Sequence, residues 1–133
     1  MPARGQSAEI ILVVEDAEAI RKMVCAALTQ IGYTCLEAAD GAEALQMLNG
    51  GSKVRLVLTD IVMPRMGGPE LAEHLALTRP DLRVIFMSGY ADHPVIQSRK
   101  ESATEFLAKP FTASALADTV RRVLNSGRVS RTR

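Results

Sequence analysis

The chain has 133 residues, 47% of them hydrophobic, which is enough for one domain with its own apolar core, so neither disulfides nor structural metals are required for folding. Its 16 basic and 15 acidic residues give a net charge of +1, which excludes an overall field that would hold nucleic acid or an anionic membrane. No secretory signal precedes the first apolar run, and that run is too short to span a bilayer. We therefore expect a cytoplasmic protein without membrane insertion, in which Cys25 and Cys35 are reduced.

The first two predicted elements are a buried strand and an amphipathic helix. A continuous apolar run from residue 10 to 14 ends in Glu15 and Asp16. Residues 17–31 then repeat apolar side chains at helical spacing, with Ile31 as the last inward residue. Gly32 follows where a helix commonly ends in glycine.

A second strand and a second helix follow in the same order. Residues 33–38 form a short strand pattern. Asp40 and Glu43 resemble a capping box that opens a helix through Asn49. This repeated alternation is typical of a parallel sheet covered by helices.

The third strand ends abruptly at a carboxylate. Its apolar residues, among them Val57 and Leu58, indicate a strand buried on both faces, and Asp60 precedes a segment rich in proline and glycine. A helix is predicted from Pro69, in the first turn, to Arg79. Asp60 therefore lies at the carboxyl edge of the predicted sheet, where ligands bind in open α/β folds.

The remaining segments continue the alternation. The predicted elements are a strand at 82–87, a short and weakly anchored helix at 92–102, a strand at 103–108 and a helix at 113–125. A basic tail, residues 126–133, is expected to be disordered. We predict one domain over residues 8–126, with flexible termini at 1–7 and 127–133.

Polar residues follow four of the five predicted strands. They are Glu15 and Asp16 after the first, Asp60 after the third, Ser88 after the fourth and Lys109 after the fifth. If the crossovers are right-handed and the acidic groups meet, the first and third strands are neighbours. The predicted fold is an α/β, flavodoxin-like, doubly wound parallel sheet of order 2-1-3-4-5 with five helices.

Gathered carboxylates repel one another, so the site requires positive charge. Mg²⁺ is the natural candidate, because it prefers one or two carboxylates, waters and a phosphate oxygen. Lys109 adds a second positive charge and Ser88 a hydroxyl donor, which together suit a phosphoryl group in transfer. Asp60 is then the nucleophile of an aspartyl-phosphate reaction, although a lone Asp after a strand can also serve only to cap a turn.

Four separated motifs resemble the response-regulator receiver domain of two-component signalling. They are VVED at 13–16, LTDIVMPRMGG at 58–68, MSGYAD at 87–92 and FLAKPF at 106–111. The amino-acid sequence of these motifs is most similar to that of receivers of hybrid histidine kinases. The resemblance implies that Asp60 is the phospho-acceptor, that Glu15 and Asp16 hold the metal with it, and that Ser88 and Phe106 are switch residues.

The resemblance also implies binding partners and the kind of reaction that the domain undergoes. A histidine kinase or phosphotransfer protein would donate the phosphoryl group, and a homodimer could form through the fourth helix, fifth strand and fifth helix. The domain would modify itself and not act as a turnover enzyme, and the bond between Lys109 and Pro110 would be cis. With Val62 and Tyr90 two places after Asp60 and Ser88, dephosphorylation is expected to be slow.

Other functions remain to be compared with this one. A phosphohydrolase that uses an aspartyl nucleophile needs a second Asp where this chain has Val62, and a dinucleotide-binding domain needs a glycine-rich turn after the first strand. No helix-turn-helix accompanies the basic tail, so a nucleic-acid role is not favoured. The main alternative is a receiver-fold interaction domain that works without phosphorylation.

Overall fold

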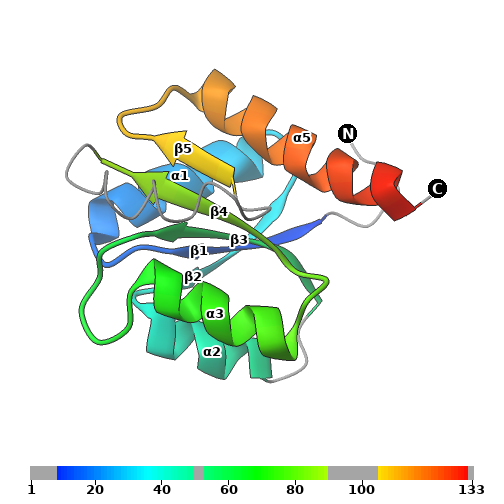
Figure 1. Cartoon of the computed structure of the whole chain (residues 1–133). Coiled ribbons are helices and arrows are strands. Elements are labelled where there is room, and N and C mark those ends of the chain that lie inside the picture. Colours follow the sequence, from blue (N-terminus) through cyan, green and yellow to red (C-terminus); the bar gives the residue numbers. More distant parts are fainter. Residues whose placement is uncertain (1–8, 50–52, 90–104, 132–133) are drawn as a thin grey trace.

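Five parallel strands form the centre of the molecule (Figure 1). The computed structural model describes residues 9–49, 53–89 and 105–131. The strands are β1 (Ile10–Val14), β2 (Thr34–Ala38), β3 (Val54–Asp60), β4 (Arg83–Ser88) and β5 (Glu105–Ala108). Their order in the sheet is β2-β1-β3-β4-β5, which confirms the predicted topology. The chain reverses its winding between β1 and β3, and at that point the carboxyl ends of the two strands lie side by side.

Helices cover both faces of this sheet (Figure 1). The described helices are α1 (Glu18–Gln30), α2 (Gly41–Asn49), α3 (Gly68–Thr78) and α5 (Ala113–Arg131). α1 and α5 lie on one face, and α2 and α3 lie on the other. The helix predicted at 92–102, and the start of the strand predicted at 103–108, lie outside the described residues. No described helix has both the length and the apolar character needed to cross a membrane.

The sheet separates two apolar cores, and β1 contributes to both. Ile11 and Val13 pack under α1 and α5, whereas Leu12 and Val14 pack under α2 and α3. All four side chains are fully buried. Alternate residues of a strand point to opposite faces, so a strand covered on both sides needs an unbroken apolar run, as the sequence has here.

The ends of two helices follow the sequence signals. Gly32 has φ +107 just after α1, a left-handed conformation that glycine adopts without steric cost. At the start of α2, Asp40 Oδ1 accepts a hydrogen bond from the Glu43 N–H at 2.9 Å. The Glu43 carboxylate accepts a bond from the N–H of Ala39, at 2.8 Å, and not from that of Asp40. Asp40 therefore caps α2, while the second bond of the expected box falls one residue earlier.

Two boundary predictions are wrong. Ile31 was expected to face inward, but α1 ends at Gln30 and Ile31 has left the helical repeat, so its side chain is 45% exposed. The last helix was expected to end at Asn125, before a disordered tail, but α5 continues to Arg131. No proline interrupts this segment, and a glycine inside a helix costs only about 1 kcal/mol, so the helix can run on.

Candidate functional site

Three carboxylates meet at the carboxyl ends of β1 and β3. Each of Glu15, Asp16 and Asp60 offers an oxygen, and these oxygens lie within 4.8 Å of one another. Glu15 is 2% exposed and Asp60 is 9% exposed, whereas Asp16 faces solvent. The parallel pairing of β1 with β3 brings residues far apart in the sequence to this one edge. We call these three residues the acidic cluster.

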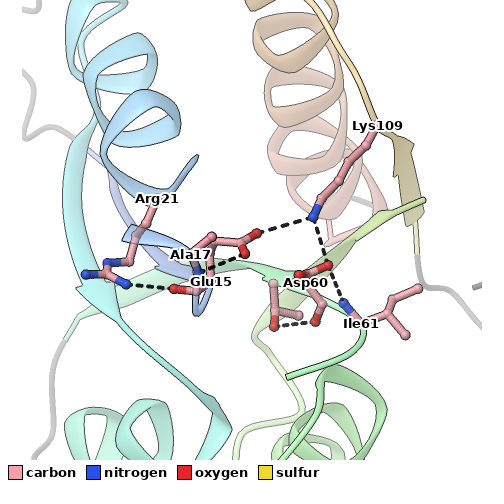
Figure 2. Close-up of polar contacts among 7 residues, drawn as sticks. Glu15, Ala17, Arg21, Asp60, Ile61 and Lys109 are labelled. Atoms are coloured by element: carbon pink, nitrogen blue, oxygen red, sulfur yellow. Dashed lines mark hydrogen bonds and ion pairs between the residues drawn. The ribbon is translucent and has the colours of Figure 1, made fainter. Parts of the chain in front are cut away.

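Lys109 supplies positive charge to the acidic cluster (Figure 2). Its Nζ lies 3.1 Å from Asp60 Oδ1 and 3.3 Å from Glu15 Oε1. The residue directly follows β5, and its backbone N–H donates to the carbonyl of Ser88 at 2.8 Å. The bond from Lys109 to Pro110 is cis, as the resemblance implied. One ammonium group therefore bridges two buried carboxylates, one directly after β1 and one at the end of β3.

Backbone contacts hold Glu15 in place. Its Oε2 accepts the N–H of Ala17 at 3.1 Å, and its carbonyl oxygen accepts Arg21 Nη1 at 2.8 Å (Figure 2). The same guanidinium donates through Nε to Glu37 of β2 at 2.9 Å. Sequence reasoning missed Arg21, because an arginine in the first turn of an amphipathic helix gives no signal of a backbone contact. Arg21 thus ties the acidic cluster to the edge of the sheet.

Asp60 is fixed by its neighbours in the chain. Its Oδ1 accepts the N–H of Ile61 at 2.9 Å, and its carbonyl oxygen accepts the hydroxyl of Thr59 at 2.9 Å. Thr59 is fully buried, and it is a second site residue that the sequence analysis missed. Among the described residues, both side-chain hydrogen bonds of Asp60 fall on Oδ1. The second carboxylate oxygen is therefore not engaged by them.

The surroundings of Glu15 and Lys109 raise the pKa of both groups. Burial raises the pKa of the Glu15 carboxyl, and the charge of Asp60 raises it further, against the opposing effects of the Ala17 N–H and of Lys109. Burial alone would lower the pKa of Lys109, but its contacts with Asp60 and Glu15 outweigh burial and raise it. Lys109 therefore offsets only in part the effects of burial and of Asp60 on Glu15.

The donor set of the acidic cluster fits Mg²⁺. All three groups offer hard oxygen atoms within 4.8 Å of one another, and one of the three carboxylates, that of Asp16, is open to solvent. Mg²⁺ keeps several waters and takes one or two carboxylates, so a partly exposed cluster suits it better than a closed cage would. Glu15, Asp16 and Asp60 are the residues that would hold the ion.

Ser88 and Phe106 lie on the strands beyond Asp60. Ser88 is the last residue of β4 and is 4% exposed. In the pairing of β4 with β3, Asp60 lies opposite Met87, the residue just before Ser88. Phe106 on β5 is half-buried, and its ring centroid lies 5.5 Å from that of the fully buried Phe86. The two proposed switch residues thus occupy adjacent strands.

The loop from β3 to α3 is compact because it contains glycines. A Cβ on Gly68 would lie 2.4 Å from the carbonyl oxygen of Asp60, and one on Gly67 would lie 2.8 Å from that of Ile61. The N–H of Gly68 donates to the Ile61 carbonyl at 2.9 Å. Val62, in the same loop, is 67% exposed, while Tyr90 lies outside the described residues. The chain after Asp60 therefore folds back tightly against the acceptor strand.

The profile of the response regulator receiver domain matches residues 11–121. This chain belongs to that family. It is 43% identical over 116 residues to the sensor kinase CckA of Brucella abortus (strain 2308). The aligned region covers 86% of this chain and 12% of CckA. It is 33% identical to the response regulator receiver protein CpdR of the same strain, covering 86% of this chain and 95% of CpdR. The receiver family therefore includes relatives both much longer than this chain and of similar length.

Solved structures of receivers share this fold. The receiver domain of NtrX from Brucella abortus superposes with a TM-score of 0.78 at 32% identity, covering 86% of this chain and 98% of that one. A receiver domain protein from Clostridium thermocellum gives a TM-score of 0.84 at 28% identity, covering 91% and 98%. The full NtrX chain is matched over only 29% of its length. These likenesses agree with the observed strand order.

Proposed function

We propose that this receiver accepts a phosphoryl group from a phosphohistidine of a histidine kinase or phosphotransfer protein onto Asp60. The observation that carries the proposal is the placement of Asp60 within the acidic cluster and 3.1 Å from the Lys109 ammonium. A carboxylate nucleophile, oxygen ligands for a divalent cation and a positive charge are the parts that such a transfer needs.

In the transfer, a carboxylate oxygen of Asp60 attacks phosphorus, and the phosphorus–nitrogen bond to the donor imidazole breaks. The imidazole leaves with the electron pair of that bond, and an acyl phosphate remains on Asp60. Lys109 pairs with the incoming phosphoryl oxygens as its contact with Asp60 loosens, and Ser88 donates its hydroxyl to them. Mg²⁺, when bound by the acidic cluster, supplies charge that offsets the carboxylates and the phosphoryl oxygens.

Phosphorylation is then read out as a change of shape. The new group adds almost two negative charges and three acceptor oxygens, which draw the hydroxyl of Ser88 toward Asp60. Movement of Ser88 frees space, and Phe106 turns toward Phe86 to fill it. The contact between the two rings, 5.5 Å between centroids, supports this route. The surface beside β5 and α5 changes as a result, which is where a partner or a second copy would bind.

The domain modifies itself in the cytoplasm and does not turn over a separate substrate. An alternative function is a receiver-fold interaction domain that needs no phosphorylation. The two buried carboxylates of the acidic cluster, those of Glu15 and Asp60, favour phosphotransfer, because desolvated carboxylates are costly to keep where they serve only the fold.

The test is incubation with a small phosphoramidate and Mg²⁺, followed by intact mass. The wild type should gain about 80 Da, the mass of one phosphoryl group, and Asp60→Asn should gain nothing, because the amide is a poor nucleophile of the same shape. Asp16→Asn should be labelled more slowly and bind Mg²⁺ more weakly, as measured by calorimetry, since the ion loses a charged ligand. Labelling of Asp60→Asn at the wild-type rate would refute the assignment, and an unlabelled wild type would favour the interaction domain.

A further inference from the structure

Arg21 joins the backbone of Glu15 to the edge strand β2. Its Nη1 donates to the Glu15 carbonyl oxygen at 2.8 Å (Figure 2), and its Nε donates to Glu37 Oε1 at 2.9 Å. The Arg21 side chain is 14% exposed, so the guanidinium is mostly withdrawn from solvent. Lys22 Nζ binds the other oxygen of Glu37 at 3.1 Å, and its side chain is 58% exposed. Glu37 thus pairs with two cations, and of these Arg21 is the one that contacts Glu15.

The carbonyl that Arg21 binds belongs to the peptide group between Glu15 and Asp16, both members of the acidic cluster. A peptide group is planar, so a hydrogen bond to its oxygen orients the whole group. The N–H of Glu15 donates to the carbonyl of Ala38 in β2 at 3.0 Å, which orients the preceding peptide group in the same way. The Asp16 side chain is exposed, and within the described residues no side-chain hydrogen bond holds it. The direction of the Asp16 carboxylate therefore depends on the backbone that Arg21 holds.

We propose that Arg21 is a positioning residue for Mg²⁺, which holds the peptide group between Glu15 and Asp16 so that their carboxylates stay together with that of Asp60. The inference rests on the proposed function, because that function assigns Mg²⁺ to the acidic cluster. Contacts behind the ligands of a metal orient those ligands, and loss of such a contact commonly weakens metal binding. Arg21 acts here through the backbone of Glu15, to which its guanidinium is bonded.

The positive charge of Arg21 makes the direction of the expected effect informative. A cation beside the acidic cluster repels Mg²⁺, so if Arg21 acted through its charge alone, a neutral residue in its place would strengthen Mg²⁺ binding. If Arg21 positions the carboxylates, the same replacement weakens Mg²⁺ binding instead. Lys22 has the same charge and the same partner Glu37, but its ammonium is bonded to Glu37 and not to Glu15. Replacing Lys22 is therefore the matched control for charge.

The first measurement is a calorimetric titration of Mg²⁺ into the full, unphosphorylated chain at neutral pH and constant ionic strength. Arg21→Met should raise the dissociation constant for Mg²⁺ at least about threefold, whereas Lys22→Met should bind Mg²⁺ no more weakly than the wild type does. Arg21→Lys keeps the charge but offers one nitrogen in place of the two that contact Glu15 and Glu37, so it should weaken binding at least about twofold. Far-UV circular dichroism identifies any variant that does not fold, and the lysine variant serves if the methionine variant fails.

Three outcomes of the titration would overturn the proposal. They are Mg²⁺ binding by the Arg21 variants that equals or exceeds that of the wild type, an equal loss of binding in Lys22→Met, and no Mg²⁺ binding by the wild type.

Labelling with the small phosphoramidate separates Mg²⁺ binding from phosphoryl transfer. Arg21→Met should need at least about threefold more Mg²⁺ to reach half of its maximal labelling rate, while that maximal rate stays within about twofold of the wild-type rate. A loss of folded protein would instead lower the rate at every Mg²⁺ concentration. A lower maximal rate with an unchanged Mg²⁺ requirement would contradict the proposal.

The two measurements also distinguish this inference from the proposed function. If the wild type binds Mg²⁺ but is not labelled, the proposed function fails, and the titration alone decides the role of Arg21. If Arg21→Met binds Mg²⁺ as the wild type does and both are labelled at Asp60, the proposed function stands and the positioning role of Arg21 fails.

Discussion

Replacing Lys109 with methionine should expose the repulsion between Glu15 and Asp60. The ammonium of Lys109 contacts both carboxylates, at 3.3 and 3.1 Å, and their oxygens lie within 4.8 Å of each other. Two unit charges at that separation repel by about 3 kcal/mol at an effective dielectric near 20. Because the Lys109 side chain is 26% exposed, water already screens part of the interaction. We expect the variant to lose about 1–3 kcal/mol of unfolding free energy at neutral pH.

The loss should depend on pH in a definite direction. The pKa of Glu15 is raised by burial and by Asp60, so the folded state binds this proton more tightly than the unfolded state does. Stability therefore falls as pH rises from about 4.5, the ordinary value for Glu, through the folded pKa of Glu15. Without Lys109 stability should fall further over this range, because only the Ala17 N–H then offsets the charge of Glu15. The gap between wild type and variant should be small near pH 4.5 and widen toward pH 7.

Urea unfolding is the suitable assay, because urea leaves the ionic strength unchanged. The unfolding free energy of wild type and variant should be measured near pH 4.5 and at pH 7, with and without Mg²⁺. The ion should reduce the difference between the two proteins, because it restores positive charge to the acidic cluster. Lys53→Met is the matched control, since Lys53 is exposed and belongs to no described ion pair. A gap that is the same at both pH values and indifferent to Mg²⁺ would mean that Lys109 stabilises the fold by packing, and the electrostatic reasoning would fail.

Three further predictions concern the surroundings of the acceptor. Asp40→Ala should lose about 1–2 kcal/mol of unfolding free energy in urea at neutral pH, because the cap of α2 and the ion pair with Arg65 are both lost. The cap bond and Arg65 lower the pKa of Asp40, so the difference in unfolding free energy between wild type and variant should shrink as the pH falls below 3.8 and vanish below the folded pKa. Gly68→Ala should lose at least about 1–3 kcal/mol and slow labelling of Asp60, since its Cβ would lie 2.4 Å from a carbonyl oxygen; unchanged stability would contradict the packing described. Val62→Asn should leave stability within about 0.5 kcal/mol, because the side chain is exposed, yet hasten decay of the phosphorylated form followed by mass; an equal or longer lifetime would refute a role for this position.

The strand order and the acidic edge were predictable because they follow from local patterns and chirality. Unbroken apolar runs mark strands covered on both faces, and right-handed crossovers then leave few arrangements. The polar residues at the strand ends, from Glu15 to Lys109, therefore gather at one edge. Which carboxylate meets which partner could not be predicted in this way, since it depends on side-chain conformation.

Two contacts of the site were not predicted, because the residue types that make them form no recognisable sequence pattern. Arg21 donates to a backbone carbonyl, and any residue offers such a carbonyl. Thr59 stands within an apolar run, where its hydroxyl serves only to bond the Asp60 carbonyl. The end of α5 was missed for a different reason, because the sequence has no stop signal there and polar composition alone does not end a helix.

The bridge made by Arg21 determines what happens to the acidic cluster when the solution becomes acidic. Arg21 and Lys22 lower the pKa of Glu37, so this pair persists below the pH at which a free glutamate would take up a proton. Glu15, whose pKa is raised, becomes neutral at higher pH than Glu37 does. During acidification the cluster therefore gives up charge while Arg21 still holds the Glu15 backbone in position. β2 supplies none of the three carboxylates, yet through Glu37 and Arg21 it keeps the Glu15 backbone in place. Glu15 can therefore ionise again in the same position when the pH rises.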